Sequence, residues 1–307
     1  MTVSILVGDC VEQMKLLPSG SMQMCVTSPP YFGLRDYGVD GQIGRELTPD
    51  EFVSSLVIVF REVKRLLKDD GTLWLNIGDS YARTGGTDKK PSVSATVGST
   101  RNTLKQNSDR KQNAASIGLK AKDLVGVPWM LAFALRADGW YLRQEIIWHK
   151  TNAMPESVKD RCVKAHEQIF LLTKKPKYYF DYDAVREPAV KGASGSKFNK
   201  GKTATHQLNR ASEKDRAETA TRNKRSVWAI ATQPFAEAHF ATFPPSLIEP
   251  CILAGSRFGD TVLDPFGGAG TTGLVSQQHG RDAVLTELNP EYAEIARRRI
   301  GTGAFVL

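Results

Sequence analysis

A short turn near the amino terminus carries residues suited to the chemistry of an amine. After a largely apolar run at 22–26, the chain reads Ser28, Pro29, Pro30 and Tyr31. Prolines fix the backbone angle φ and remove N–H donors, so a serine hydroxyl and a proline carbonyl can accept the two hydrogens of an amino group. A nucleobase amine needs such acceptors, because its lone pair is delocalised into the ring. The tyrosine ring offers a face on which a base can stack.

A glycine-rich turn near the carboxyl terminus is suited to binding a cofactor. The expected strand 261–263 leads through Asp264 and several glycines into an expected helix, 270–279. Glycines allow the backbone to approach a ligand closely, and the first N–H groups of a helix can bind it. Glu287 ends the next expected strand, where an acid can accept hydrogen bonds from two ribose hydroxyls. The pattern fits NAD and S-adenosylmethionine equally well.

Both motifs resemble those of the amino-group DNA methyltransferases. Residues 264–271 resemble the cofactor motif of that family, and residues 28–31 resemble its catalytic motif. The order, with the catalytic motif first, resembles the β class of the family. Shorter segments also match, and the resemblance covers roughly 1–82, 123–185 and 226–301.

The resemblance implies a reaction and a substrate. An enzyme of this family flips a base out of duplex DNA and transfers a methyl group from S-adenosyl-L-methionine to an exocyclic amine. Ser28 and the carbonyl of Pro29 would orient the amine, and Tyr31 would stack on the base. Within the family, serine at the first catalytic position suggests N4 of cytosine, whereas Asp or Asn suggests N6 of adenine. Methylation of adenine stays open as the alternative.

The resemblance also assigns residues to the cofactor. Six residues would cradle its methionine and ribose portions: Asp264, Pro265, Phe266, Gly268, Gly270 and Thr271. Glu287 would accept the ribose hydroxyls, and the segment from His239 to Phe243 would lead into a helix that closes over the methionine end. Asp9 would meet the adenine amino group of the cofactor, or it is the N-cap of a helix.

Positive charge is concentrated in two polar segments. The 307-residue chain has a net charge of +8. Residues 83–122 hold nine Lys or Arg against two Asp, and residues 189–226 hold ten against three acids. Both segments are poor in aromatic residues and are expected to be mobile without a ligand. They predict phosphate contacts with DNA, and solvated loops are the alternative.

The second of these segments, taken as 186–226, is the expected region of target recognition. The basic residues proposed there to bind nucleic acid are Lys197, Lys200, Lys202, Arg210, Arg222, Lys224 and Arg225. The DNA sequence recognised does not follow from these residues. A cognate restriction endonuclease, a solitary or phage-borne enzyme, and a homodimer all stay open.

Other classes of protein fit the sequence less well. The four scattered cysteines argue against zinc or a disulfide framework and fit a bacterial or phage-encoded cytoplasmic protein. No apolar run is long enough to span a membrane, and no signal peptide is expected. Methylation at C5 of cytosine needs a cysteine nucleophile, usually just after a proline. The one Pro-Cys pair in the sequence is Pro250-Cys251, and Cys251 is expected to be a buried structural residue, which argues against that reaction. An NAD-dependent oxidoreductase, a non-catalytic DNA-binding protein, and an RNA or protein methyltransferase remain as weaker alternatives.

Strands and helices alternate along the chain, which predicts a doubly wound, mostly parallel, Rossmann-like α/β sheet in a single catalytic domain over 1–307. The expected strands are 4–8, 22–27, 71–77, 141–149, 168–173, 261–263 and 281–286, and 141–149 with 168–173 is expected to form an antiparallel edge hairpin. The expected helices are 10–17, 48–68, 127–137, 244–254, 270–279 and 290–300. Both motifs follow strands at their carboxyl ends, where such sheets bind ligands. They are therefore expected to meet.

Overall fold

An eight-stranded sheet forms the centre of the protein. The computed structural model describes residues 1–34, 38–82, 118–189, 221–233 and 243–303. The strands lie in the order β1-β10-β9-β2-β3-β5-β4-β8. Their bounds are β1 (Val3–Val7), β2 (Met22–Thr27), β3 (Leu67–Ile77), β4 (Tyr141–His149), β5 (His166–Thr173), β8 (Val227–Ala229), β9 (Thr261–Asp264) and β10 (Asp282–Glu287).

The strand directions confirm the doubly wound fold. From β1 to β3 all neighbouring strands are parallel, and β5 then runs antiparallel to both β3 and β4. Every residue of β2 is buried, as expected for a central strand of a parallel sheet that is covered on both faces. Because β2 lies directly beside β9, the first and last parts of the chain meet in the middle of the sheet.

Among the described residues, three helices cover each face of the sheet. On one face α1 (Cys10–Lys15), α2 (Pro49–Leu66) and α3 (Val127–Ala137) pack on side chains such as Cys25 and Leu73. On the other face α5 (Pro245–Gly255) packs on Met24, Val26 and Trp74, and α6 (Thr271–Gln278) and α7 (Pro290–Gly303) pack nearer β1 and β10. Alternate residues of β2 thus serve opposite halves of the core.

Local sequence signals explain where several elements begin. The sequence from Thr48 to Glu51 forms a capping box at the start of α2, because Thr48 Oγ1 accepts from the Glu51 N–H at 3.1 Å and the Glu51 carboxylate accepts from the Thr48 N–H at 3.2 Å. Strands β2 and β4 and helix α3 have the predicted bounds. Strand β3 begins at Leu67, four residues earlier than expected, directly after α2.

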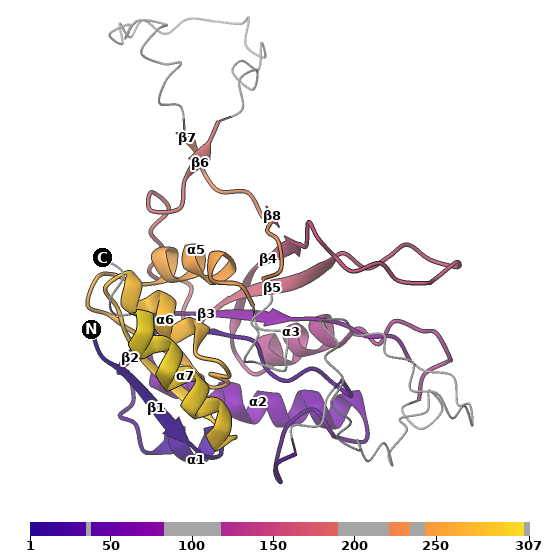
Figure 1. Ribbon diagram of the computed structural model, residues 1–307, viewed down its shortest axis with the longest axis horizontal. Helices are drawn as coiled ribbons and strands as arrows, with labels where there is room; N and C mark the ends of the chain where they lie inside the picture. Colours follow the sequence, from indigo (N-terminus) through magenta and orange to yellow (C-terminus); the bar gives the residue numbers. More distant parts are fainter. Residues whose placement is uncertain (35–37, 83–117, 190–220, 234–242, 304–307) are drawn as a thin grey trace, which may run out of the picture.

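The edge of the sheet differs from the expectation. Strands β4 and β5 are antiparallel as predicted, but the three-residue strand β8 pairs with β4 and forms the edge instead. Two further strands, β6 (Glu187–Pro188) and β7 (Thr221–Arg222), form a narrow antiparallel ribbon that stands away from the central sheet (Figure 1). These short strands have no detectable alternation in sequence. Residues 83–117 and 190–220, which make up most of the two basic segments, lie outside the described residues.

Gly270 begins α6 with φ at +77°, and a Cβ placed there would lie 2.8 Å from the Cβ of Ala296 in α7. We expect Gly270→Ala to lower the free energy of unfolding by about 2–4 kcal/mol, because left-handed backbone strain and overpacking both oppose it. Gly259 is the matched control, since its φ is +79° and nothing lies within 4 Å of its Cβ position. Gly259→Ala should cost only about 1 kcal/mol. Urea denaturation measures both, and equal losses would contradict the packing argument.

Candidate active site

The two predicted motifs lie side by side: residues 28–31, called here the catalytic turn, and residues 264–271, called the cofactor turn. Strands β2 and β9 pair in parallel, with Cys25 opposite Leu263, so their carboxyl ends emerge together. A hydrogen bond joins the carboxyl ends of the two strands directly, because Thr27 Oγ1 donates to Asp264 Oδ1 at 2.6 Å. The structure therefore brings together two motifs that are more than 230 residues apart, as their positions in sequence predicted.

Asp264 is the buried anchor of the cofactor turn. Its side chain is 1% exposed and accepts from Thr27 Oγ1, from the Phe266 N–H at 3.0 Å and from Thr272 Oγ1 at 2.6 Å. Burial raises the pKa of this carboxyl group, and the three donors act against that rise. Sequence analysis identified Asp264 but missed Thr272. The fixed carboxylate shapes the turn and ties it to the catalytic strand.

The glycine turn leaves room for a ligand. Gly268 adopts φ of +50°, and a Cβ placed there would meet only the Phe266 carbonyl oxygen, at 3.9 Å. Its N–H donates to Glu287 Oε2 at 2.8 Å. The Pro265 carbonyl accepts from Thr286 Oγ1 at 2.7 Å, which fastens the turn to β10. A tightly held backbone with open space above it is the arrangement that a bound nucleoside requires.

Glu287, the last residue of β10, binds the backbone of this turn. The partly buried carboxylate accepts one backbone N–H at each oxygen, from Gly268 and, at 2.9 Å, from Asn289. Burial is the largest influence on its pKa and raises it. Each carboxylate oxygen has a second acceptor position, so the group can also accept the two hydroxyls of a ribose.

The other residues predicted to bind the cofactor are Asp9, Thr271, His239 and Phe243, and the three that the structure describes make different contacts. Asp9 is exposed and caps α1, accepting from the N–H groups of Val11 and Glu12 at 2.9 and 3.0 Å. Thr271 Oγ1 accepts from Arg299 at 2.8 Å, a residue that sequence analysis did not single out. Phe243 packs against the core next to α5, whereas His239 lies outside the described residues. Capping gives Asp9 a structural role whether or not it contacts a cofactor.

The catalytic turn follows β2 without a gap. Pro29 is buried, and Ser28, Pro30 and Tyr31 are partly buried. The Tyr31 hydroxyl donates to Glu167 Oε2 at 2.6 Å. The ring lies close to Gly78, where an added Cβ would come within 2.6 Å of the Tyr31 Cε2 atom. The tyrosine is therefore fixed at its hydroxyl and along one side of its ring.

A polar cluster beside Tyr31 was not predicted from the sequence. Glu167, which is 9% exposed, accepts from Asn76 Nδ2 at 3.2 Å and also from the ammonium group of Lys150. Lys164 lies close by, and burial lowers its pKa. The available signal was a glutamate near the start of β5, two residues before the apolar run Ile169–Leu172.

The basic residues described at the second segment make contacts within the protein. Glu187 Oε1 accepts from Arg222 Nε at 2.8 Å and from Arg225 Nε at 2.6 Å, and Lys224 lies 5.0 Å above the Trp228 ring. These contacts brace the β6–β7 ribbon. The other proposed DNA-binding residues lie outside the described part of the chain: Lys197, Lys200, Lys202 and Arg210.

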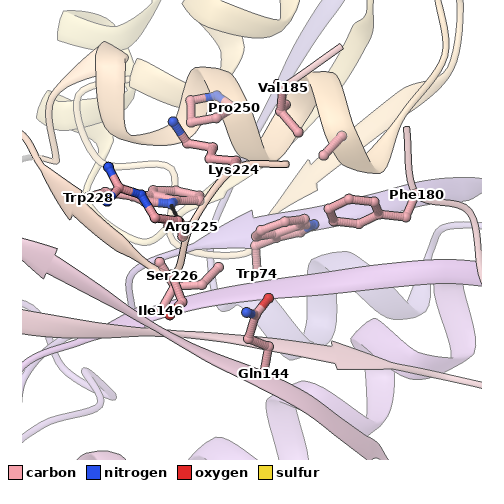
Figure 2. A pocket seen from close by; sticks show the side chains of 11 residues that line it. Trp74, Gln144, Ile146, Phe180, Val185, Lys224, Arg225, Ser226, Trp228 and Pro250 are labelled. Atoms are coloured by element: carbon pink, nitrogen blue, oxygen red, sulfur yellow. Dashed lines mark hydrogen bonds between the residues drawn. The ribbon is translucent and has the colours of Figure 1, made fainter. Parts of the chain in front are cut away.

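Two tryptophans near the edge of the sheet are core residues. Trp148 and Trp228 are 3% and 7% exposed, and their indole N–H groups donate to the carbonyls of Ile230 and Arg225. Trp228 borders a cavity of about 30 Å³ under α5 (Figure 2). That volume suits a water molecule rather than a base. The cavity is lined by none of the residues assigned to catalysis or the cofactor.

Cys251 has the structural role that the sequence predicted. It is 1% exposed within α5, its thiol donates to the Leu247 carbonyl, and burial raises its pKa strongly. A thiol held in this state is a poor nucleophile. Among the described residues, no cluster of His, Cys, Asp or Glu could hold a metal ion. No helix in the described ranges is long and apolar enough to cross a membrane.

Known proteins are similar to this chain in both sequence and fold. Residues 22–298 match the DNA methylase family that comprises N6 and N4 enzymes. The chain belongs to this family. The type II methyltransferase M.Cfr9I of Citrobacter freundii is 48% identical over 301 residues, which cover 95% of this chain and 86% of that protein. M.SmaI of Serratia marcescens is also 48% identical, over 96% of this chain and 90% of that protein.

Solved methyltransferases have the same architecture. The PvuII DNA methyltransferase, described as cytosine-N4-specific, aligns with a TM-score of 0.64 at 19% identity and covers all of this chain and 87% of that one. A putative DNA modification methylase from Thermus thermophilus, solved with S-adenosyl-L-methionine, aligns with a TM-score of 0.58 at 22% identity, over 100% of this chain and 98% of that one. Both confirm the Rossmann-like fold.

Family membership confirms the coarser predictions of reaction and cofactor. The protein is a site-specific DNA amino-methyltransferase of the type II group, and its methyl donor is S-adenosyl-L-methionine. An oxidoreductase that binds NAD at the same glycine turn is excluded by this membership. The roles of individual residues stay predictions, as does the base that is methylated.

Cofactor binding should weaken in acid through Glu287. In the predicted complex the ribose hydroxyls would donate to the charged carboxylate, so protonation of Glu287 would remove these acceptors and lower the affinity as pH decreases through the pKa. Because burial raises that pKa, the loss should begin above the ordinary value of about 4.3. Calorimetric titration with S-adenosyl-L-homocysteine between pH 7 and 5 measures it, with circular dichroism verifying that the protein stays folded. Glu287→Gln is the control and should bind weakly at every pH, whereas a flat wild-type profile would contradict the assignment.

Proposed function

We propose that this enzyme methylates the N4 amino group of cytosine in duplex DNA. The observation that carries the proposal is the turn of Ser28, Pro29, Pro30 and Tyr31, held beside the cofactor turn by the Thr27–Asp264 hydrogen bond. Within the family, serine at the first of these positions is associated with cytosine. The hydroxyl can accept a hydrogen bond as an aspartate at that position would, but it lacks the charge of the carboxylate.

The residues around Gly268 fit S-adenosyl-L-methionine. The open space over the glycine can receive the ligand, and Glu287 supplies acceptors for its ribose. Asp264 holds the turn in shape, and Phe266 lies at its partly exposed rim. When bound, the cofactor supplies a methyl group made electrophilic by the sulfonium. The polypeptide itself then has to place a nucleophile in line with that methyl group.

Orientation of the target amine falls to the catalytic turn. The hydroxyl of Ser28 and the carbonyl of Pro29 accept its two N–H groups, which pyramidalises the nitrogen and directs its lone pair. Tyr31 holds the face of the flipped base. Such alignment alone can supply much of the acceleration of a displacement reaction. A strong general base is not required before transfer, because the amine proton becomes acidic only afterwards.

Duplex DNA is the proposed partner, and the basic segment 186–226 is its proposed binding region. Lys and Arg side chains there would contact phosphates and give a salt-dependent affinity. We further propose that the enzyme acts in a bacterial or phage-infected cytoplasm and protects DNA from a cognate endonuclease, as the type II names of its relatives imply. A homodimer is compatible with this role but is not required by it.

Nucleoside mass spectrometry tests the proposed base. Phage λ DNA from a methylase-deficient host is incubated with the protein and S-adenosyl-L-methionine, then digested to nucleosides. N4-methylcytosine is the expected product. N6-methyladenine would keep the fold and the cofactor but overturn the inference from Ser28. The absence of any methylated nucleoside, with cofactor binding intact, would contradict the DNA substrate and direct attention to RNA.

Two substitutions should separate catalysis from cofactor binding. Ser28→Ala removes an acceptor for the amine and should reduce kcat at least tenfold, with the Kd for S-adenosyl-L-homocysteine unchanged. Glu287→Ala removes the ribose acceptors and should raise that Kd at least tenfold, while kcat at saturating cofactor falls less. Methyl transfer from tritiated cofactor measures the first effect, and calorimetry measures the second. The assignment of roles fails if both variants change the same constant.

A further inference from the structure

We propose that Glu167 is a positioning residue that fixes the Tyr31 ring for the target base. The inference rests on the proposed function, because it concerns the same base pocket. Glu167 lies at the start of β5, and Tyr31 follows β2, so the contact between them crosses the end of β3. Neither the resemblance nor the spacing of residues assigns Glu167 a role.

Glu167 gathers donors from three separate parts of the sheet. Its Oε2 atom accepts from the Tyr31 hydroxyl at 2.6 Å and from Asn76 Nδ2, near the end of β3, at 3.2 Å. Its Oε1 atom accepts from Lys150, the first residue after β4. The Asn76 amide also donates to the Gln168 carbonyl at 3.1 Å, which fixes its direction. One carboxylate therefore fastens the catalytic turn to the ends of β3, β4 and β5.

The charge on Glu167 is compensated in place. A buried carboxylate without a partner would be costly, but the Lys150 ammonium pairs with it and also lies 4.6 Å from the centre of the Trp148 ring. The Lys150 backbone N–H donates to the Ala165 carbonyl at 2.8 Å, so the lysine itself is held at the base of the segment between β4 and β5. The carboxylate thus has both a cation and the phenol of Tyr31 as partners.

Gly78 completes the restraint on the ring. An added Cβ would lie 2.6 Å from Tyr31 Cε2, so no larger residue fits there without moving the ring. With the hydroxyl bound to Glu167 and one side against Gly78, rotation of the ring is blocked. Tyr31 therefore contributes a preset surface, and its hydroxyl is used within the protein. Holding that surface before the base arrives should lower the entropy lost on forming the reactive complex.

A double-mutant cycle of Tyr31→Phe and Glu167→Gln tests the proposal. Tyr31→Phe keeps the ring but deletes the hydroxyl, and Glu167→Gln keeps the shape but removes the charge. Methyl transfer to phage λ DNA is followed with tritiated S-adenosyl-L-methionine below the unfolding temperature of every variant. We expect each single variant to lower kcat about tenfold, with little change in KM for the cofactor. The double variant should be no slower than the slower single variant, since both substitutions disrupt the same contact between Tyr31 and Glu167.

Glu62→Gln is the matched control. Glu62 also pairs with one cation, Arg65, at 2.8 Å, and its side chain is 21% exposed, but it lies on α2 away from the catalytic turn. This variant should keep the wild-type kcat. The proposal is overturned if Glu167→Gln turns over at the wild-type rate, or if the two losses in kcat multiply in the double variant.

Unfolding measurements separate this inference from the proposed function. The same four proteins are unfolded in urea, and the Tyr31–Glu167 contact should appear as a coupling in the free energy of unfolding even if DNA is not the substrate. An inactive wild type with that coupling would overturn the function but keep the contact. An active wild type whose cycle shows neither coupling nor loss of kcat would overturn the positioning role alone.

Discussion

The hydrogen bond from Thr27 to Asp264 holds the proposed catalytic turn next to the proposed cofactor turn. It joins the last residue of β2 to the last residue of β9, two parallel neighbours in the middle of the sheet. Both side chains are buried, and in such surroundings an unpaired carboxylate would be strongly destabilising. Because Thr272 and the Phe266 N–H share the same carboxylate, one group fixes the catalytic strand, the cofactor turn and the first turn of α6.

Acids near the termini of three strands organise the site as a whole. Asp264 in β9, Glu287 in β10 and Glu167 in β5 each accept several donors, and each is at least partly buried. The first two shape the surface proposed to face the cofactor, and the third binds the hydroxyl of the ring proposed to face the base. The protein thus presets its geometry with buried carboxylates, so that few groups need to move when substrates bind.

Sequence reasoning succeeded where the signal is local and failed where it is not. The capping box at Thr48 and the glycine turn after Asp264 depend on neighbouring residues, and both gave the correct elements. The early start of β3 was missed because Asp69, Asp70 and Gly71 interrupt its apolar pattern, and β8 is too short to show one. Glu167 was missed for another reason: its partner Tyr31 is 136 residues away, and only the order of the strands brings them together.

The neighbouring positions of β2 and β9 also have a consequence for biosynthesis. More than 230 residues separate these strands, and at about 5–20 residues per second a ribosome needs roughly ten to fifty seconds to pass from one to the other. During that time β2 lacks its partner β9, and β1 lacks its partner β10, which is made later still. The nascent chain therefore carries unpaired apolar strand edges, the kind of surface that aggregates or binds chaperones, until β9 and β10 have been synthesised.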